Sequence, residues 1–314
     1  MKCLLLRFSK EVFVKYLAFW VSLLISLQAQ AIQVTVTIPP LAALVQPYLD
    51  KDDQLTVLLT PGMSPHHFQF RPSHLKALHE ADLILTVGNV VDHWAAKPVK
   101  QIIEQNPKVL HIAMQKQPGL VVLPGREKAL LEESHVKNDG EHHHDHMDPH
   151  IWLSIANAKI MIKSIGQAWQ ILKPLKADQT LEKTEQFLAE MKVLNRQIKT
   201  LLAPIKKVPY LVLHDAFYYF ENAYGLNNLG TIQMSSEIKP SIKRVLQLRH
   251  LIQKAQVRCV FKEPQFPDNQ LNYVIRGLNV NIGSLDPMGQ FDPSKNYGDF
   301  MKELANQYQA CLQR

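Results

Sequence analysis

The chain has 314 residues, of which 46% are hydrophobic and 20% charged, and its formal net charge is +7 at pH 7. This length and composition fit a globular protein of one large or two smaller domains. Lys and Arg do not gather on one face with interleaved aromatic residues, so we expect no nucleic-acid partner. Beyond the N-terminus, no window of about 18 residues is both uncharged and apolar, so we expect a protein that is not membrane-embedded.

The N-terminus carries the pattern of an export signal. An uncharged run over residues 16–27 follows four basic residues, Lys2, Arg7, Lys10 and Lys15, and Ala29-Gln30-Ala31 fits a signal-peptidase site. We therefore expect residues 1–31 to be a cleaved signal peptide. An uncleaved membrane anchor is the alternative, and the short apolar run argues against it. Because the signal also contains Glu11, its removal takes +3 of the net charge of +7 and leaves +4.

Residues 32–113 alternate between predicted strands and predicted helices. Alternating β-branched residues predict a strand at 32–38, which Pro39-Pro40 ends. Further strands are expected at 55–59, 83–87 and 109–113, and helices at 41–48, 72–81 and 92–105. Such alternation is typical of parallel βα units with helices on both faces of the sheet.

A long helical region separates this half from a second alternating half. Helices are expected at 155–172 and 178–202, the second about 25 residues and roughly 37 Å long. Asp178 is the expected N-cap of this second helix. Strands at 209–213, 259–261 and 281–285 then alternate with helices at 217–224, 242–255, 270–278 and 297–311.

These elements predict an α/β protein of two (β/α) lobes with parallel sheets, joined by a long rigid helix. Ligands of open α/β sheets bind beyond the carboxyl ends of the strands, so we expect the site in the cleft between the lobes. The N-terminal lobe would cover residues 32–177, the connecting helix 178–204 and the C-terminal lobe 205–314.

Two cysteines, Cys259 and Cys311, remain once the signal is removed. An even pair in an exported chain favours one disulfide. Two separate buried thiols are the alternative.

A histidine-rich run at residues 141–152 divides into two parts. The first contains His142, His143, His144 and His146 among acidic residues, with no apolar residue to bury. Imidazole is the commonest protein ligand for zinc, copper and nickel, so we expect a loop at 135–146 that binds metal weakly and at several positions. A solvated spacer without a role is the alternative.

The second part contributes His150 to a set of residues at the expected loop mouths. His66, His214 and Asp286 follow expected strands, and His150 precedes the start of a helix. Three imidazoles with a carboxylate or a water complete a four-coordinate zinc shell. Each of these histidines could instead be a hydrogen-bonded surface residue, and Asp215 or Asp286 could cap the helix that follows it.

The chain resembles the periplasmic zinc-binding proteins of bacterial ABC importers, within the cluster A-I family of metal receptors. The resemblance covers residues 32–314 and rests on an ordered set of blocks, which are Pro61-Gly62-Met63-Ser64-Pro65-His66, Asp148-Pro149-His150-Ile151-Trp152-Leu153-Ser154, His214-Asp215-Ala216-Phe217, Glu237-Ile238-Lys239-Pro240, Phe261-Lys262-Glu263-Pro264-Gln265-Phe266 and Leu285-Asp286-Pro287-Met288-Gly289. It implies a monomeric receptor that is not an enzyme. Such a receptor takes up periplasmic Zn²⁺ as its transported ligand and passes it to an inner-membrane permease and its ATPase.

The resemblance also implies roles for single residues. His66, His150 and His214 would be the metal ligands, where manganese-type relatives have a glutamate in place of His214. A third imidazole favours zinc over manganese, which prefers oxygen. Some zinc-type members carry a glutamate just before the first histidine, where this chain has Pro65, so the fourth ligand is expected to be Asp286 or a water.

The family further implies an acidic, histidine-rich loop near the cleft and, in some members, a C-terminal disulfide that matches Cys259–Cys311. Two other functions fit parts of the pattern. A zinc hydrolase would need a general base, and His79-Glu80 lacks the second histidine of a His-Glu-x-x-His motif because Leu83 stands there. A surface zinc scavenger or adhesin is the other alternative.

Overall fold

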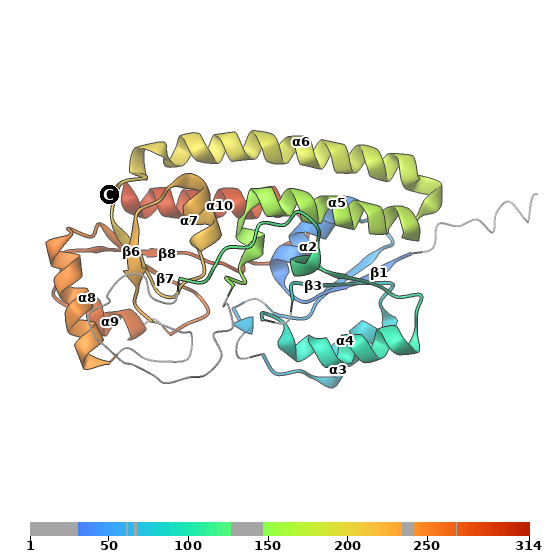
Figure 1. Ribbon diagram of the computed structural model, residues 1–314, viewed down its shortest axis with the longest axis horizontal. Helices are drawn as coiled ribbons and strands as arrows, with labels where there is room; N and C mark the ends of the chain where they lie inside the picture. Colours follow the sequence, from blue (N-terminus) through green and yellow to red (C-terminus); the bar gives the residue numbers. More distant parts are fainter. Residues whose placement is uncertain are drawn as a thin grey trace, which may run out of the picture. The chain divides into compact units, whose positions relative to one another are not determined.

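The N-terminal sheet of the computed structural model has four parallel strands in the order β2-β1-β3-β4 (Figure 1). These are β1 (Gln33–Val36), β2 (Gln54–Val57), β3 (Leu83–Thr86) and β4 (Leu110–Ala113). The structure describes residues 31–60, 62–65, 68–88, 90–126, 147–233, 241–267 and 269–314. The expected signal peptide therefore lies outside the described residues, except for Ala31.

The C-terminal sheet repeats this arrangement in the order β6-β5-β7-β8, again with every pair parallel. Its strands are β5 (Tyr210–Val212), β6 (Asn228–Thr231), β7 (Cys259–Lys262) and β8 (Asn281–Ser284). Two parallel sheets confirm the predicted fold class. Strand β6 was not predicted, because its sequence Asn-Leu-Gly-Thr contains two residue types that are depleted in strands.

Helices cover the sheets and connect them. They are α2 (Pro39–Val45), α3 (Pro72–Glu80), α4 (His93–Gln105), α5 (Ile155–Leu172), α6 (Ala177–Leu202), α7 (Tyr218–Tyr224), α8 (Ile242–Lys254), α9 (Asn269–Ile275) and α10 (Tyr297–Leu312). Figure 1 shows α6 running alongside both α5 and α10. None of the helices in the described ranges combines the length and apolar character that crossing a bilayer requires.

The long helix α6 packs on both halves of the protein through one buried stripe. Phe187, Met191, Leu194 and Ile198 form this stripe, as their spacing predicts. They belong to a core cluster that also contains Val36 of β1 and Tyr210 of β5. The expected N-cap was wrong by two residues, because Lys176 occupies that position and Asp178 lies in the first turn. There its charge still favours the positive end of the helix dipole.

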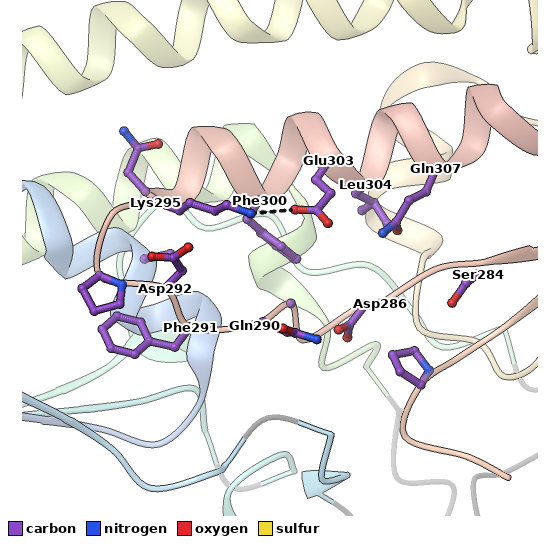
Figure 2. A pocket seen from close by; sticks show the side chains of 15 residues that line it. Ser284, Asp286, Gln290, Phe291, Asp292, Lys295, Phe300, Glu303, Leu304 and Gln307 are labelled. Carbon is purple, nitrogen blue, oxygen red and sulfur yellow. Dashed lines mark ion pairs between the residues drawn. The ribbon is translucent and has the colours of Figure 1, made fainter.

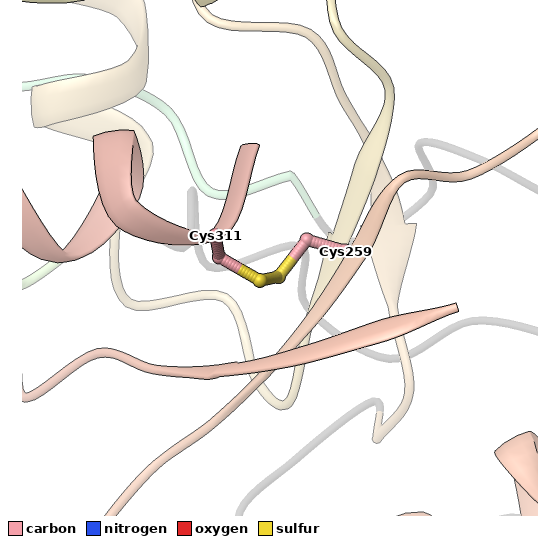
Figure 3. The surroundings of a disulfide bond; sticks show 2 residues. All are labelled: Cys259 and Cys311. Atoms are coloured by element: carbon pink, nitrogen blue, oxygen red, sulfur yellow. A yellow bond between two sulfur atoms is a disulfide. The ribbon is translucent and has the colours of Figure 1, made fainter. Parts of the chain in front are cut away.

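The disulfide between Cys259 and Cys311 joins β7 to α10 (Figure 3). Both residues are buried, and 52 positions of sequence separate them. The predicted pairing is confirmed. Closing a loop of this length restricts the unfolded chain and contributes about 4 kcal/mol in the chain-entropy description.

A buried ion cluster secures the start of the first sheet to the end of α5. The Lys173 ammonium donates to Asp50 at 2.7 Å and to both oxygens of Asp53 at 2.6 and 2.7 Å. The Asp53 side chain is fully buried and also accepts from the backbone N–H of Ile32 at 2.9 Å. Hydrogen bonds from Lys173 and Lys176 lower the pKa of Asp50 to about 2.

We predict that Lys173→Met destabilises the protein by about 3–5 kcal/mol, because it leaves the Asp53 carboxylate buried without its cation. Urea unfolding of the two proteins measures this loss. Lys176→Met is the matched control: among the described residues the Lys176 ammonium pairs with Asp50 alone, and it is 38% exposed, so its loss should cost less than about 1 kcal/mol. An equal loss of unfolding free energy in the two variants would contradict the role of Lys173 as the cation that balances buried Asp53.

Candidate metal centre

His150 lies just before a buried 3₁₀ turn, Ile151–Leu153, and is oriented by the carboxylate two residues earlier. The Oδ1 atom of Asp148 accepts from the backbone N–H of His150 at 2.9 Å and from its ring Nδ1 at 2.8 Å. The ring also packs edge-on against Trp152, with centroids 5.2 Å apart. A histidine that donates Nδ1–H to a carboxylate presents Nε2 as the basic, metal-binding nitrogen.

His214 lies two residues after the end of β5 and is oriented in the same way by Glu263, which directly follows the neighbouring strand β7. The Oε1 atom of Glu263 accepts from the His214 ring Nδ1 at 2.6 Å and from its backbone N–H at 3.2 Å. Glu263 is only 1% exposed. Burial lowers the pKa of His214, but the charge and hydrogen bond of Glu263 outweigh it and raise the pKa above its ordinary value of 6.5.

The two oriented imidazoles face each other across a small cavity. Their ring centroids are 5.7 Å apart and their planes make an angle of 64°. Zn–N bonds of about 2.0–2.1 Å at a tetrahedral angle would place two imidazole centroids roughly 5 Å apart. The cavity has a volume of about 10 Å³, which suits a single water-sized guest. It is lined by Ser64, Pro65, His150, His214, Glu263, Gln265, Phe266, Pro287 and Met288.

The structure brings some of the predicted ligands together and leaves others aside. His66 lies outside the described residues, although its neighbours Ser64 and Pro65 line the cavity. His142, His143, His144 and His146 also lie outside them. Across the described ranges, no group of three or more His, Cys, Asp or Glu side chains could hold a metal. The described residues thus supply two of the predicted imidazoles, and the full ligand set remains a prediction.

Asp286 lines a second, larger cavity of about 560 Å³ along α10 (Figure 2). Its Oδ1 atom accepts from the Gln265 side chain at 2.6 Å and from the Met288 backbone N–H at 3.0 Å. Gln265 lines the histidine cavity, so Asp286 is connected to that cavity through a hydrogen bond. Its role as a fourth ligand remains a prediction.

Arg126 links the N-terminal half to the segment that carries His214. Its guanidinium pairs with Asp215, the residue after His214, and with Glu221 of α7 at 2.7 Å. The same group lies 4.2 Å from the centre of the Tyr218 ring. Although burial lowers the pKa of Arg126, the two carboxylates raise it overall, so the guanidinium stays charged. Asp215 therefore does not cap α7, whose N-cap is Phe217 with no side-chain hydrogen bond.

A second link joins the segments of the two histidines. The Tyr219 hydroxyl donates to the Asp148 carbonyl oxygen and accepts from the Leu123 backbone N–H, each at 3.0 Å. Asp148, which orients His150, is therefore held by α7, the helix that follows His214.

Sequence reasoning missed the orienting roles of Asp148 and Glu263. For Asp148 a signal was present, because a carboxylate two residues before a histidine can reach its ring. For Glu263 no local signal exists: 49 positions separate it from His214, and only the pairing of β5 with β7 brings the two together. Arg126 was missed for the same reason, since 89 positions separate it from Asp215.

Comparison with known proteins places the chain in a family. The sequence matches the family model of ZnuA, the periplasmic component A of zinc-uptake complexes, over residues 34–311. The chain is similar to the high-affinity zinc uptake system protein ZnuA of Yersinia pestis, with 33% identity over 89% of this chain and 91% of that protein. The high-affinity zinc uptake system protein ZnuA of Brucella suis biovar 1 (strain 1330) is 28% identical over 92% of this chain and 94% of that protein.

The fold agrees with that placement. A crystal structure of ZnuA superposes with a TM-score of 0.75 at 24% identity, covering 90% of this chain and all of that one. The two oriented histidines thus lie in a chain that belongs to the family of periplasmic A components of zinc-uptake complexes.

Proposed function

We propose that this protein captures Zn²⁺ in the periplasm and passes it to an inner-membrane ABC permease for ATP-driven import. The observation that carries the proposal is the pair of imidazoles at 5.7 Å, each oriented by a buried carboxylate, around a cavity of single-ion size. Membership of a family of solute receptors, and not of enzymes, supports it. Export by cleavage of residues 1–31 and a division into lobes at 32–177 and 205–314, joined by 178–204, are parts of the proposal.

The proposed ligands are His66, His150 and His214, with water as the fourth ligand in the resting site. Glu263 Oε2 and Gln265 Oε1 are buried atoms without a hydrogen-bond partner in the described structure, and both residues line the cavity. A zinc-bound water has two protons to donate, so it would satisfy both oxygens. Asp286, in contrast, is held through Oδ1, which accepts hydrogen bonds from the Gln265 side chain and the Met288 backbone N–H.

The first prediction concerns the ligands. His150→Ala and His214→Ala should each weaken zinc binding by more than about 100-fold. Removing the partner that orients a ligand typically weakens binding by about 10–100-fold, and removing the ligand itself should weaken it more. Calorimetry in the presence of a competing chelator measures this. The exposed His79→Ala is the control and should bind zinc normally, whereas Asp286→Asn should change affinity less than about tenfold if water is the fourth ligand. Normal affinity of His214→Ala would contradict the assigned site.

The second prediction concerns pH. A ring must be unprotonated to bind zinc, and the pKa of His214 lies above its ordinary 6.5. Zinc affinity should therefore be constant at alkaline pH. As the pH is lowered, affinity should begin to fall at a higher pH than it would for a histidine with an ordinary pKa. Glu263→Gln removes the charge that raises this pKa. The fall should then begin at lower pH, while affinity at alkaline pH drops by about 10–100-fold.

Titration of zinc affinity against pH for both proteins tests this prediction. Glu303→Gln provides the control, because Glu303 is 58% exposed and pairs with Lys295 away from the histidines. Superimposable pH profiles of Glu263→Gln and the unmodified protein would show that Glu263 does not act on His214.

The third prediction concerns the histidine-rich stretch. We infer that residues 135–146 bind further zinc ions weakly, because His142, His143, His144 and His146 stand among acidic residues. Deleting 135–146 should leave one tight site and remove the weaker ones in a calorimetric titration. A variant with these four histidines changed to Asn should behave like the deletion. Disappearance of the tight site in either variant would mean that the ligands are wrongly assigned.

A further inference from the structure

The outer face of α8 exposes apolar side chains that the core does not use. The inner face packs Leu248 and Ile252 into a core cluster on one side of the C-terminal sheet, while α10 packs on the other side. Ile242 and Leu246, one turn apart on the outer face, are 82% and 62% exposed. Ile242 is the most exposed large hydrophobic residue in the described structure. Figure 1 shows α8 beside α9 at the edge of this lobe.

The same stretch is cationic throughout. Helix α8 contains no Asp or Glu and four basic residues, which are Lys243, Arg244, Arg249 and Lys254. This charge of +4 equals that expected of the whole exported chain. By contrast, α6 has four acidic and four basic residues. The exposed apolar pair therefore lies on the helix with the largest net charge among the long helices in the described ranges.

The basic residues of α8 divide into two groups. Arg244 and Arg249 donate to backbone carbonyl oxygens, of Thr231 and of Val274 and Arg276, at 2.8–2.9 Å, so their role is structural. Lys243 and Lys254 are exposed and make no ion pair within the described structure. Together with exposed His250, these two lysines lie on the same side of the helix as Ile242 and Leu246. We refer to Ile242, Lys243, Leu246, His250 and Lys254 as the α8 face.

We propose that the α8 face is a docking surface for the anionic phospholipid headgroups of a membrane. Lysine ammonium groups around exposed aliphatic side chains are the pattern of an interfacial helix, in which cations bind headgroup phosphates and apolar side chains enter the boundary below them. An acidic protein partner is less well matched. Protein interfaces are depleted in Lys and obtain their affinity from buried Trp, Tyr and Arg, which the α8 face lacks.

Binding of this kind is weak, reversible and sensitive to salt. Each Lys or Arg close to an anionic bilayer strengthens attachment by about fivefold, and screening removes most of this gain at high ionic strength. It would hold the protein near the membrane without fixing it there. The proposal uses none of the residues of the metal centre, so its failure would leave the proposed zinc function untouched.

Vesicle flotation of the exported chain, residues 32–314, tests the proposal. We expect binding to phosphatidylglycerol–phosphatidylethanolamine vesicles at low salt, little binding to pure phosphatidylcholine vesicles, and release at high salt. Lys243→Gln with Lys254→Gln should weaken binding by about 25-fold, and Leu246→Gln should weaken it at unchanged charge. Lys192→Gln with Lys199→Gln on α6 is the control: it removes the same charge and should change binding far less.

Three outcomes would overturn the proposal. The first is no binding to anionic vesicles at low salt. The second is an equal loss in the α6 control, which would show attraction by net charge alone. The third is poor growth under zinc limitation of cells that carry the α8 variants, although these variants still bind vesicles normally. That result would identify an acidic protein surface as the partner. Unchanged zinc affinity and urea unfolding of the α8 variants establish that any loss of vesicle binding is local.

Discussion

The proposed metal centre depends on the packing of two separate sheets onto one set of helices. His150 precedes α5, and His214 follows a strand of the other sheet. The rings come within 5.7 Å of each other because α5, α6 and α10 share one core with strands of both sheets. A ring misplaced by about 1 Å would already impair a site whose ligands need ångström-level accuracy. The stiff α6 thus acts as a frame for the site as well as a connector.

Local support complements this frame. Each imidazole takes its orienting carboxylate from its own half of the chain, Asp148 for His150 and Glu263 for His214. Glu263 serves this role through Oε1, which accepts from both the ring and the backbone of His214. Links between the halves are made by Arg126 to Asp215 and by the Trp152 indole to the Pro287 carbonyl oxygen at 2.7 Å. One support also takes part in joining the halves, because the Asp148 carbonyl oxygen accepts from the Tyr219 hydroxyl of α7.

Much of the fold follows from local sequence patterns, and much of the site does not. Helix α5 begins and ends where its periodicity predicts, and the Cys259–Cys311 pairing is confirmed. Strand β6 escaped prediction because Asn and Gly suit turns better than strands. The site residues His150 and His214 stand out by type and position, whereas Glu263 and Arg126 act across long sequence separations. Their roles follow from strand order and packing, which no local pattern encodes.

The pairing of each imidazole with a buried carboxylate has a consequence for the charge of the site. The Asp148 and Glu263 carboxylates place two negative charges directly behind neutral rings, and a divalent cation can balance them. A monovalent ion would leave an uncompensated negative charge in a medium of low polarity, and a trivalent ion a positive one. The charge and hydrogen bond of Glu263, with the charges of Asp215 and Asp148, outweigh burial and raise the pKa of His214. The carboxylates behind the imidazoles therefore favour a divalent guest by charge, separately from any preference for nitrogen or oxygen ligands.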